Sequence, residues 1–337
     1  MASENIKPII GITIGDAAGI GPEVSLKAAA DASVSRECRP VLIGSLAHLR
    51  EAARVLKIPI SVVPHVPESA VPENVVEVID AGSLPHETPT GIDHAVTGKA
   101  SAEWIKEAVR LCTAGAISAI ATAPISKKAI ALGGYNFPGH TEFLAELTST
   151  ERFAMSFFAE SLRVVLLSTH VPLSTAIDMV TKDRLIDTIR FTQRHLSELL
   201  NRDIRLAVAG LNPHASENGM FGDEESREIV PAVEICRDEF GIDVSGPYSP
   251  DTIFLRGYRG EFDAIVACYH DQATIAVKAL SFGSSVNVTL GLPIIRTSVD
   301  HGTAFDIAGK GIADASSMKA AIRLAADLVL IRDANRR

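Results

Sequence analysis

The chain is poor in cysteine and in aromatic residues. Its four cysteines (Cys38, Cys112, Cys236 and Cys268) are scattered through 337 residues without a C-x-x-C pair, which argues against a disulfide framework and a thiolate zinc site. Aromatic residues make up only 5% of the chain, so alanine, valine, isoleucine and leucine must fill the core. This composition favours layered packing of helices and sheets over a β-sandwich.

Long apolar runs and clusters of one charge are also missing. No apolar stretch is long enough to cross a bilayer, and the first residues do not follow the plan of a signal peptide, so we expect a cytoplasmic protein. The net charge is −9, from 32 basic and 41 acidic side chains. Nucleic acid and anionic membranes are therefore not expected partners, and an anionic substrate would need a local basic pocket.

Short apolar runs rich in β-branched residues alternate with helix-like segments along the whole chain. The expected strands are 8–14, 39–44, 58–63, 75–79, 117–122, 154–158, 163–167, 205–209, 264–268 and 285–289. The main expected helices are 22–30, 46–56, 99–114, 183–201, 224–239, 275–280 and 316–333. This alternation predicts a mostly parallel, three-layer α/β/α architecture, and the length allows two domains.

Three of the apolar runs each lead to a histidine: His170, His214 and His270. Ligands of open α/β sheets bind beyond the carboxyl ends of the strands, so we expect the three imidazoles at one edge of the sheet. Three neutral imidazoles are the ligand set of an open, catalytic divalent-metal site. A structural role fits each histidine taken alone, and it is the shared position that favours a metal. Asp271 and Gln272 follow His270 and could orient its ring.

Two loops carry further unusual residues. Glycines 15, 19 and 21 lie between a strand and a helix without the spacing of a dinucleotide or Walker A motif, so they either admit a phosphate or simply make a tight turn. His140 and Thr141 begin an expected helix, whose start could bind an anion. The alternative there is an N-cap, with Thr141 capping and Glu142 complementing the helix dipole.

Polar side chains interrupt apolar elements near the end of the chain. Lys278, Asn287 and Arg296 could all be satisfied by one anionic ligand, such as a phosphate or carboxylate. A salt bridge from Lys278 or Arg296 to Asp300 or Asp306 is the alternative. His301, in a segment dense in polar residues and glycine, could be a fourth metal ligand, but we favour a structural donor.

Taken together, the motifs resemble the 4-hydroxythreonine-4-phosphate dehydrogenase family of vitamin B6 biosynthesis. The matching segments are GDAAGIGPE (15–23), FPGHTE (137–142), NPHA (212–215), PDT (250–252), YHDQ (269–272) and RTSVDHGTA (296–304). The resemblance implies a fold like that of isocitrate and isopropylmalate dehydrogenases. We place one domain at 1–125 plus about 300–337, and the second at about 126–299. It also implies a homodimer whose active site lies in the interdomain cleft and is completed by the other subunit.

The resemblance also implies the chemistry. A divalent metal (Zn, Mg or Co) would bind His170, His214 and His270, and the substrate would bind His140, Thr141, Lys278, Asn287 and Arg296. The expected reaction is oxidation of 4-phosphohydroxy-L-threonine by NAD or NADP, followed by decarboxylation. Lys278, Asp251 and Asp271 are the candidate catalytic residues, with either aspartate accepting or relaying the proton. No standard fingerprint identifies the residues that bind the nicotinamide cofactor.

One segment departs from the family pattern. After YHDQ the chain continues Ala-Thr-Ile-Ala (273–276), where family members usually have Gly-His/Leu-x-Pro. This segment lies between a predicted metal ligand and a predicted substrate lysine, so paralogous substrates stay open: D-threonate or D-erythronate 4-phosphate, or an aromatic cis-dihydrodiol such as that of terephthalate. A transferase, or a sugar-phosphate binder without catalysis, are further alternatives on a similar fold.

Overall fold

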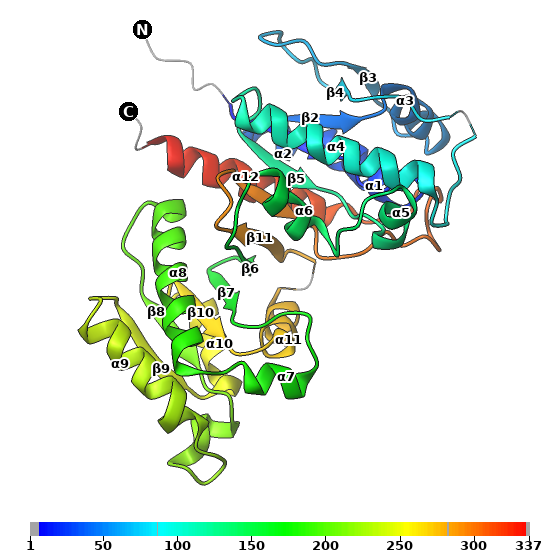
Figure 1. The fold of residues 1–337 in the computed structure, drawn as a ribbon. Coiled ribbons are helices and arrows are strands. Elements are labelled where there is room, and N and C mark those ends of the chain that lie inside the picture. The colour runs from blue at the N-terminus through cyan, green and yellow to red at the C-terminus, as the bar shows by residue number, and fades with distance from the viewer. Residues whose placement is uncertain (1–6, 86, 282, 335–337) are drawn as a thin grey trace, which may run out of the picture. The chain divides into compact units, whose positions relative to one another are not determined.

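The computed structural model describes residues 7–85, 87–281 and 283–334, and it divides into two compact units (Figure 1). Unit 1 comprises the described residues of Met1–Arg152 and Leu292–Leu330. Unit 2 comprises Phe153–Gly291 and the described residues of Ile331–Arg337. Both units are layered α/β structures, as the alternation of elements predicts.

Unit 1 is built on a fully parallel sheet with the strand order β3-β4-β2-β1-β5-β12. Its strands are β1 (Ile9–Thr13), β2 (Arg39–Gly44), β3 (Ser61–Pro64), β4 (Val75–Asp80), β5 (Ala119–Thr122) and β12 (Arg296–Ser298). Its helices are α1 (Gly21–Ala29), α2 (Ala32–Glu37), α3 (Leu46–Val55), α4 (Ala95–Thr113), α5 (Lys127–Leu132), α6 (His140–Leu147) and most of α12 (Ser316–Ala334). The long helix α4 packs against β1 and β2 (Figure 1).

Unit 2 contains a mixed sheet with the strand order β11-β6-β7-β10-β8-β9. Its strands are β6 (Ala154–Ala159), β7 (Leu162–Leu166), β8 (Leu206–Ala209), β9 (Val244–Tyr248), β10 (Ala264–Ala267) and β11 (Val286–Leu290). Its helical elements are α7 (Leu173–Asp178), α8 (Lys182–Leu200), η1 (Pro213–Glu217), η2 (Glu225–Ile229), α9 (Val230–Asp238), α10 (Pro250–Tyr258) and α11 (His270–Leu280). Strand β6 is antiparallel to both of its neighbours, β11 and β7. The remaining pairs, β7 with β10, β10 with β8 and β8 with β9, are parallel.

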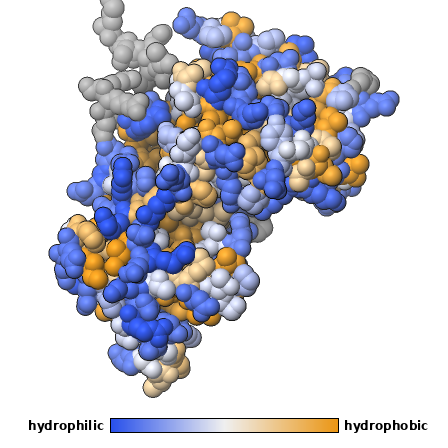
Figure 2. Space-filling model, in the orientation of Figure 1, coloured by the Kyte–Doolittle hydropathy of each residue, from blue (hydrophilic) through white to orange (hydrophobic). Residues whose placement is uncertain are grey.

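Strands β5, β8 and β10 are buried along their whole length, which is typical of parallel strands covered on both faces. The core of unit 2 consists of apolar side chains from strands β6, β7, β8 and β10 and from helices α10 and α11, including Phe157, Leu166, Ile265 and Val277. The described residues contain no helix that is long and apolar enough to cross a membrane. On the face in Figure 2, hydrophilic and hydrophobic residues are interspersed over both units.

The boundaries of the units differ from the division predicted near residues 125 and 300. Residues 126–152 and 292–299 group with unit 1. The reason for the first segment is the close packing of α5 on α4, where a side chain at Gly98 would come within 1.8 Å of the Ala129 carbonyl oxygen. The second segment contains β12, which pairs with β5.

Candidate active site

The three histidine-bearing segments of unit 2 follow strands that are neighbours in its sheet. The order β7-β10-β8 is parallel throughout, so His170, His270 and His214 all lie beyond the carboxyl ends of adjacent strands. The rings of His170 and His270 are 5.5 Å apart between centroids. His214 is exposed, and its ring lies 6.4 Å from that of Phe221. Among the described residues, no three His, Cys, Asp or Glu side chains converge closely enough to form a ready-made metal site.

Hydrogen bonds tie the three segments together just before the histidines. Ser168 Oγ donates to the Cys268 carbonyl at 2.9 Å, which connects the ends of β7 and β10. The buried Gln272 amide accepts from Cys268 N–H at 2.8 Å and donates to the Gly210 carbonyl at 2.7 Å, which connects the ends of β10 and β8. Gln272 therefore fixes the backbone of two segments rather than the imidazole that the sequence suggested it could orient.

The acidic candidates differ in what they contact. Asp271 Oδ1 lies 2.7 Å from His270 Nδ1, so this carboxylate can orient the ring and leave Nε2 for a ligand, as the adjacency in sequence suggested. Asp251 is exposed in the first turn of α10 and contacts the Ser249 hydroxyl at 2.5 Å. His301 Nδ1 lies 3.0 Å from the Gly302 carbonyl, as expected for a structural donor.

Unit 1 contains a buried cation at the start of β12. Arg296 is 3% exposed, and its Nε and Nη2 atoms donate to Thr122 Oγ1 at 3.2 and 2.8 Å. Burial lowers the pKa of Arg296 to about 9, with Glu142 opposing the change, so the guanidinium remains charged at neutral pH. In the same unit, His140 lies close enough to Arg296 for the guanidinium charge to oppose protonation of the imidazole.

His140 and the start of α6 complete this basic region. Burial, together with the charge of Arg296, lowers the pKa of His140 well below its usual range, so the ring is neutral at pH 7. Its Nε2 is buried without a hydrogen-bond partner in the described structure. The cap of α6 is Gly139, which provides no side-chain acceptor, so the predicted capping by Thr141 is wrong. Glu142 lies in the first turn, as predicted, and Thr141 is buried.

Lys278 and Asn287 belong to unit 2. Lys278 is exposed on α11, so it does not need a ligand to satisfy a buried charge, in contrast to the sequence argument. Asn287 is half-buried on β11 opposite Phe157. The glycine loop of unit 1 favours the tight-turn interpretation, because a side chain at Gly19 would come within 2.7 Å of the Thr303 carbonyl oxygen and one at Gly21 within 2.2 Å of the Ile14 carbonyl oxygen.

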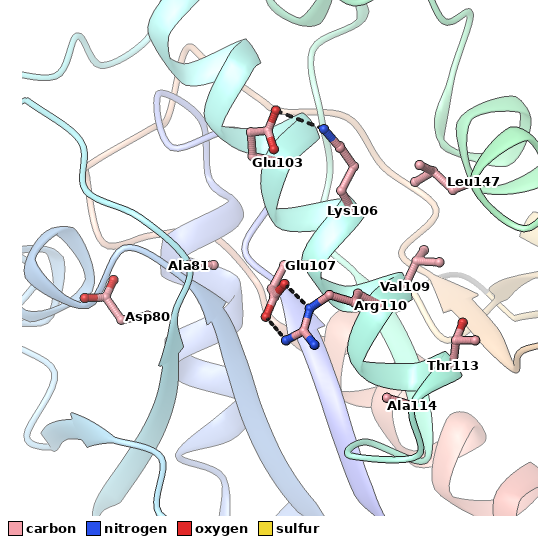
Figure 3. A pocket seen from close by; sticks show the side chains of 10 residues that line it. All are labelled: Asp80, Ala81, Glu103, Lys106, Glu107, Val109, Arg110, Thr113, Ala114 and Leu147. Carbon is pink, nitrogen blue, oxygen red and sulfur yellow. Dashed lines mark hydrogen bonds and ion pairs between the residues drawn. The ribbon is translucent and has the colours of Figure 1, made fainter.

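An open pocket of unit 1 contains none of the predicted site residues. It runs along α4, and its lining is dominated by two ion pairs of that helix (Figure 3). Glu103 pairs with Lys106 at 3.3 Å and Glu107 with Arg110 at 2.7 Å. These partly exposed side chains neutralise one another, which is typical of a solvated helix face.

Comparison with known proteins decides the family. The family model described as "Pyridoxal phosphate biosynthetic protein PdxA" matches residues 36–325. The chain belongs to the PdxA family. The family resemblance predicted from the sequence motifs is therefore confirmed.

Relatives of this PdxA-family chain have two activities in their names. It is 46% identical to a D-threonate 4-phosphate dehydrogenase of Cupriavidus necator, over 96% of this chain and 98% of that one. It is also 46% identical to a 4-hydroxythreonine-4-phosphate dehydrogenase of Desulfosudis oleivorans, over 96% of each chain. A crystal structure of the 4-hydroxythreonine-4-phosphate dehydrogenase of Klebsiella pneumoniae has a TM-score of 0.88 at 41% identity, covering 96% of this chain and 99% of that one.

These relatives are all dehydrogenases, so the PdxA-family chain is an oxidoreductase, as predicted, and the family implies a nicotinamide cofactor.

Sequence reasoning missed one buried acidic residue of the candidate site, Glu225, which contacts the segment that bears His214. The signal was present in Glu224-Glu225 at the start of an expected helix, but nothing in the residue types indicates that one carboxylate turns back toward residues 211–216.

Proposed function

We propose that this PdxA-family chain oxidises 4-phosphohydroxy-L-threonine with NAD or NADP, in a metal-dependent reaction whose keto-acid product then loses carbon dioxide. The family description and the 46% identity to a 4-hydroxythreonine-4-phosphate dehydrogenase support this substrate. The observation that carries the proposal is the charged, buried Arg296 beside a neutral His140, because such a pair is suited to a phosphate and has little use in a purely structural core.

In this proposal unit 1 binds the phosphate. Arg296 supplies a fixed charge, and its planar guanidinium suits the oxygens of a phosphate. The neutral His140 donates from Nε2, the atom that has no partner in the described structure. Thr141 and the uncapped N–H groups of the first turn of α6 add further donors, which the helix dipole strengthens.

In unit 2, His170, His214 and His270 would hold a divalent metal. The donor set fits, since all three are imidazoles beyond the ends of adjacent parallel strands and Asp271 already engages Nδ1 of His270. When bound, a divalent metal supplies Lewis acidity that lowers the pKa of an adjacent substrate hydroxyl. The chain's own residues then have two tasks, which are to orient the substrate and to accept its proton.

The proton and the hydride leave the substrate separately. A bound nicotinamide would accept the hydrogen of the alcohol carbon as a hydride, and the O–H proton would pass to a base, which together would give a ketone, the reduced cofactor and one proton. We assign the base to Asp251, because Asp271 is engaged with His270, whereas Asp251 is exposed and its contact in the described part of the chain is with the Ser249 hydroxyl. Lys278 and Asn287 would bind the remaining polar groups of the substrate and fix its geometry.

A second candidate substrate is D-threonate 4-phosphate. The D-threonate 4-phosphate dehydrogenase of Cupriavidus necator is as similar to this chain as the 4-hydroxythreonine-4-phosphate dehydrogenase of Desulfosudis oleivorans. The departure at 273–276 also falls between His270 and Lys278, which in this proposal hold the metal and the substrate's polar groups other than the phosphate. For either substrate we propose a homodimer, as the family resemblance implies.

The test is reduction of NAD⁺ or NADP⁺ followed at 340 nm, with and without EDTA. The substrates are 4-phosphohydroxy-L-threonine, D-threonate 4-phosphate, D-erythronate 4-phosphate and the unphosphorylated form of each. Turnover of 4-phosphohydroxy-L-threonine that EDTA abolishes supports the proposal, and turnover of D-threonate 4-phosphate alone supports the second candidate. Equal turnover of phosphorylated and unphosphorylated forms would contradict the role of Arg296.

A further inference from the structure

The segment that bears His214 has an unusual backbone. Five successive non-glycine residues, 214–218, have positive φ angles, from 43° at Glu217 to 71° at Ser216. His214 itself has φ 53° and ψ 28°. L-residues avoid the left-handed region, and a run of five is costly, so the surrounding structure must hold this turn in place.

The carboxylate of Glu225 is one of the groups that hold this turn, and it bonds to residues on both sides of His214. Its Oε1 accepts from Leu211 N–H at 2.8 Å and from Asn212 N–H at 2.7 Å, just before the turn. Its Oε2 accepts from the Asn212 side-chain amide at 2.9 Å and contacts the hydroxyl of Ser216, which lies in the middle of the turn. One side chain therefore joins the residues before His214 to the residue two positions after it.

The position of Glu225 makes this anchor rigid. Glu225 is 3% exposed and begins a π-helical turn that leads directly into α9. Burial alone would raise its pKa, but the bonds from Ser216 and Asn212 lower it, so the carboxylate stays ionised and can accept every one of these bonds. The turn also packs closely against Gly210, since a side chain at that position would come within 3.0 Å of the Ala215 Cα.

We propose that Glu225 is a positioning residue for metal binding: by holding the left-handed turn 214–218, it fixes the direction in which His214 presents its imidazole. The inference rests on the metal role proposed for His214. Groups that orient a ligand without touching the metal commonly change metal affinity by about 10- to 100-fold when they are removed. Glu225 acts through residues on both sides of the ligand residue instead of through its imidazole ring.

Two other glutamates serve as controls that distinguish an effect on the position of His214 from an effect on the stability of the fold. Glu224 is adjacent and has the same charge, but the hydrogen bond that it accepts among the described residues comes from the Asn212 side-chain amide, at 2.7 Å. Glu23 resembles Glu225 in environment, because it is 2% exposed and accepts from the N–H groups of Gly311 and Ala313, but it belongs to unit 1. Glu23 also pairs with Lys27 at 2.7 Å, so its loss removes a buried, well-bonded carboxylate without touching the turn.

The experiment measures the affinity of the full-length protein for Zn²⁺ alone, by competition with a chromophoric chelator and without substrate or cofactor. We expect Glu225→Ala to weaken Zn²⁺ binding by about 10-fold or more, with an unchanged far-ultraviolet circular dichroism spectrum. Glu225→Gln should weaken it less, because the amide oxygen still accepts from one or both N–H groups. Glu224→Gln and Glu23→Ala should stay within about twofold of the original protein.

The outcomes distinguish this inference from the function it rests on. If His214→Ala binds Zn²⁺ as tightly as the original chain, the metal role of His214 fails. If His214→Ala loses binding while Glu225→Ala keeps it, only the positioning role fails. A loss in Glu23→Ala equal to that in Glu225→Ala would also overturn it, since affinity would then follow stability. Should Glu225→Ala not fold, Ser216→Ala removes one bond of the same anchor, and unchanged Zn²⁺ affinity in that variant would overturn the inference.

Discussion

Replacing Arg296 with methionine should leave the stability of the fold unchanged or raise it, while it weakens substrate binding. The guanidinium is 3% exposed, and burial lowers its pKa from the ordinary value of 12.5 to about 9. A fall of this size corresponds to a net cost of roughly 5 kcal/mol for keeping the cation charged in the folded state. Because the pKa of a base is lowered in the folded state, this cost is fully present at pH 7 and shrinks only as the pH rises above about 9.

The net effect on stability is smaller than this figure. Arg296→Met also removes two hydrogen bonds to the Thr122 hydroxyl, each of about 1 kcal/mol. Buried charges replaced by apolar side chains of similar volume are often neutral or stabilising by about 1–4 kcal/mol. We therefore expect the melting temperature to stay the same or rise. Loss of a buried, charged contact to phosphate should cost about 2–5 kcal/mol, or roughly 30- to 5000-fold in kcat/KM.

Thermal unfolding with and without inorganic phosphate separates the two effects. A ligand present at about 100 times its Kd stabilises a protein by about 2.7 kcal/mol, and Arg296→Met should lose this response. Arg110→Met is the control, because Arg110 is an exposed arginine paired with Glu107 on α4, and it should change neither value. The reasoning is refuted if Arg296→Met melts several degrees lower and phosphate still stabilises it.

Three further predictions concern unit 2. His214→Ala should abolish metal-dependent turnover and leave the circular dichroism spectrum unchanged, since the side chain is exposed. Burial alone would raise the pKa of Asp263, but the bonds from Arg202 and Arg205 lower it to about 2. Asp263→Asn should therefore destabilise the fold by about 1–2 kcal/mol at pH 7, in urea unfolding, and the difference should disappear as the pH falls from 3.8 to 2, where the carboxylate loses its charge. Cys268 is fully buried and its pKa is raised by burial to about 12, so iodoacetamide should label it only after unfolding, as mass spectrometry of the labelled peptide would reveal.

Strong periodicity made most of the fold predictable. The strand at 39–44 was predicted with the bounds that β2 has, and the helix at 46–56 ends within one residue of α3. Strand direction was not available from the same signal, because 154–158 has the composition of a strand whether it runs parallel or antiparallel. Helix α4 begins at Ala95, four residues before its predicted start.

The two strands that the sequence did not predict, β9 and β12, contain no apolar run that indicates a strand. Strand β12 consists of Arg296, Thr297 and Ser298, and it is buried because it pairs with β5, a contact more than 170 residues away in sequence. Strand β9 contains Gly246 and Pro247, a pair that normally indicates a turn.

Part of the candidate site could be predicted from the sequence, and part of it could not. The order of residues indicated that three histidines follow strands, and those strands are indeed parallel neighbours in the sheet. The contacts of Glu225 could not be predicted, because they depend on a left-handed turn of non-glycine residues that no residue type in the sequence indicates.

The discontinuity of unit 1 has a consequence for how the chain is made. Strand β5 pairs with β1 on one side and with β12 on the other, and β12 is synthesised only after the whole of 153–291. The nascent unit 1 therefore keeps one edge of its sheet open while unit 2, whose strands lie within one stretch of sequence, can already fold. Arg296 lies on β12, the strand that pairs with this open edge. The proposed phosphate-binding residue is therefore synthesised together with the last strand of the unit 1 sheet.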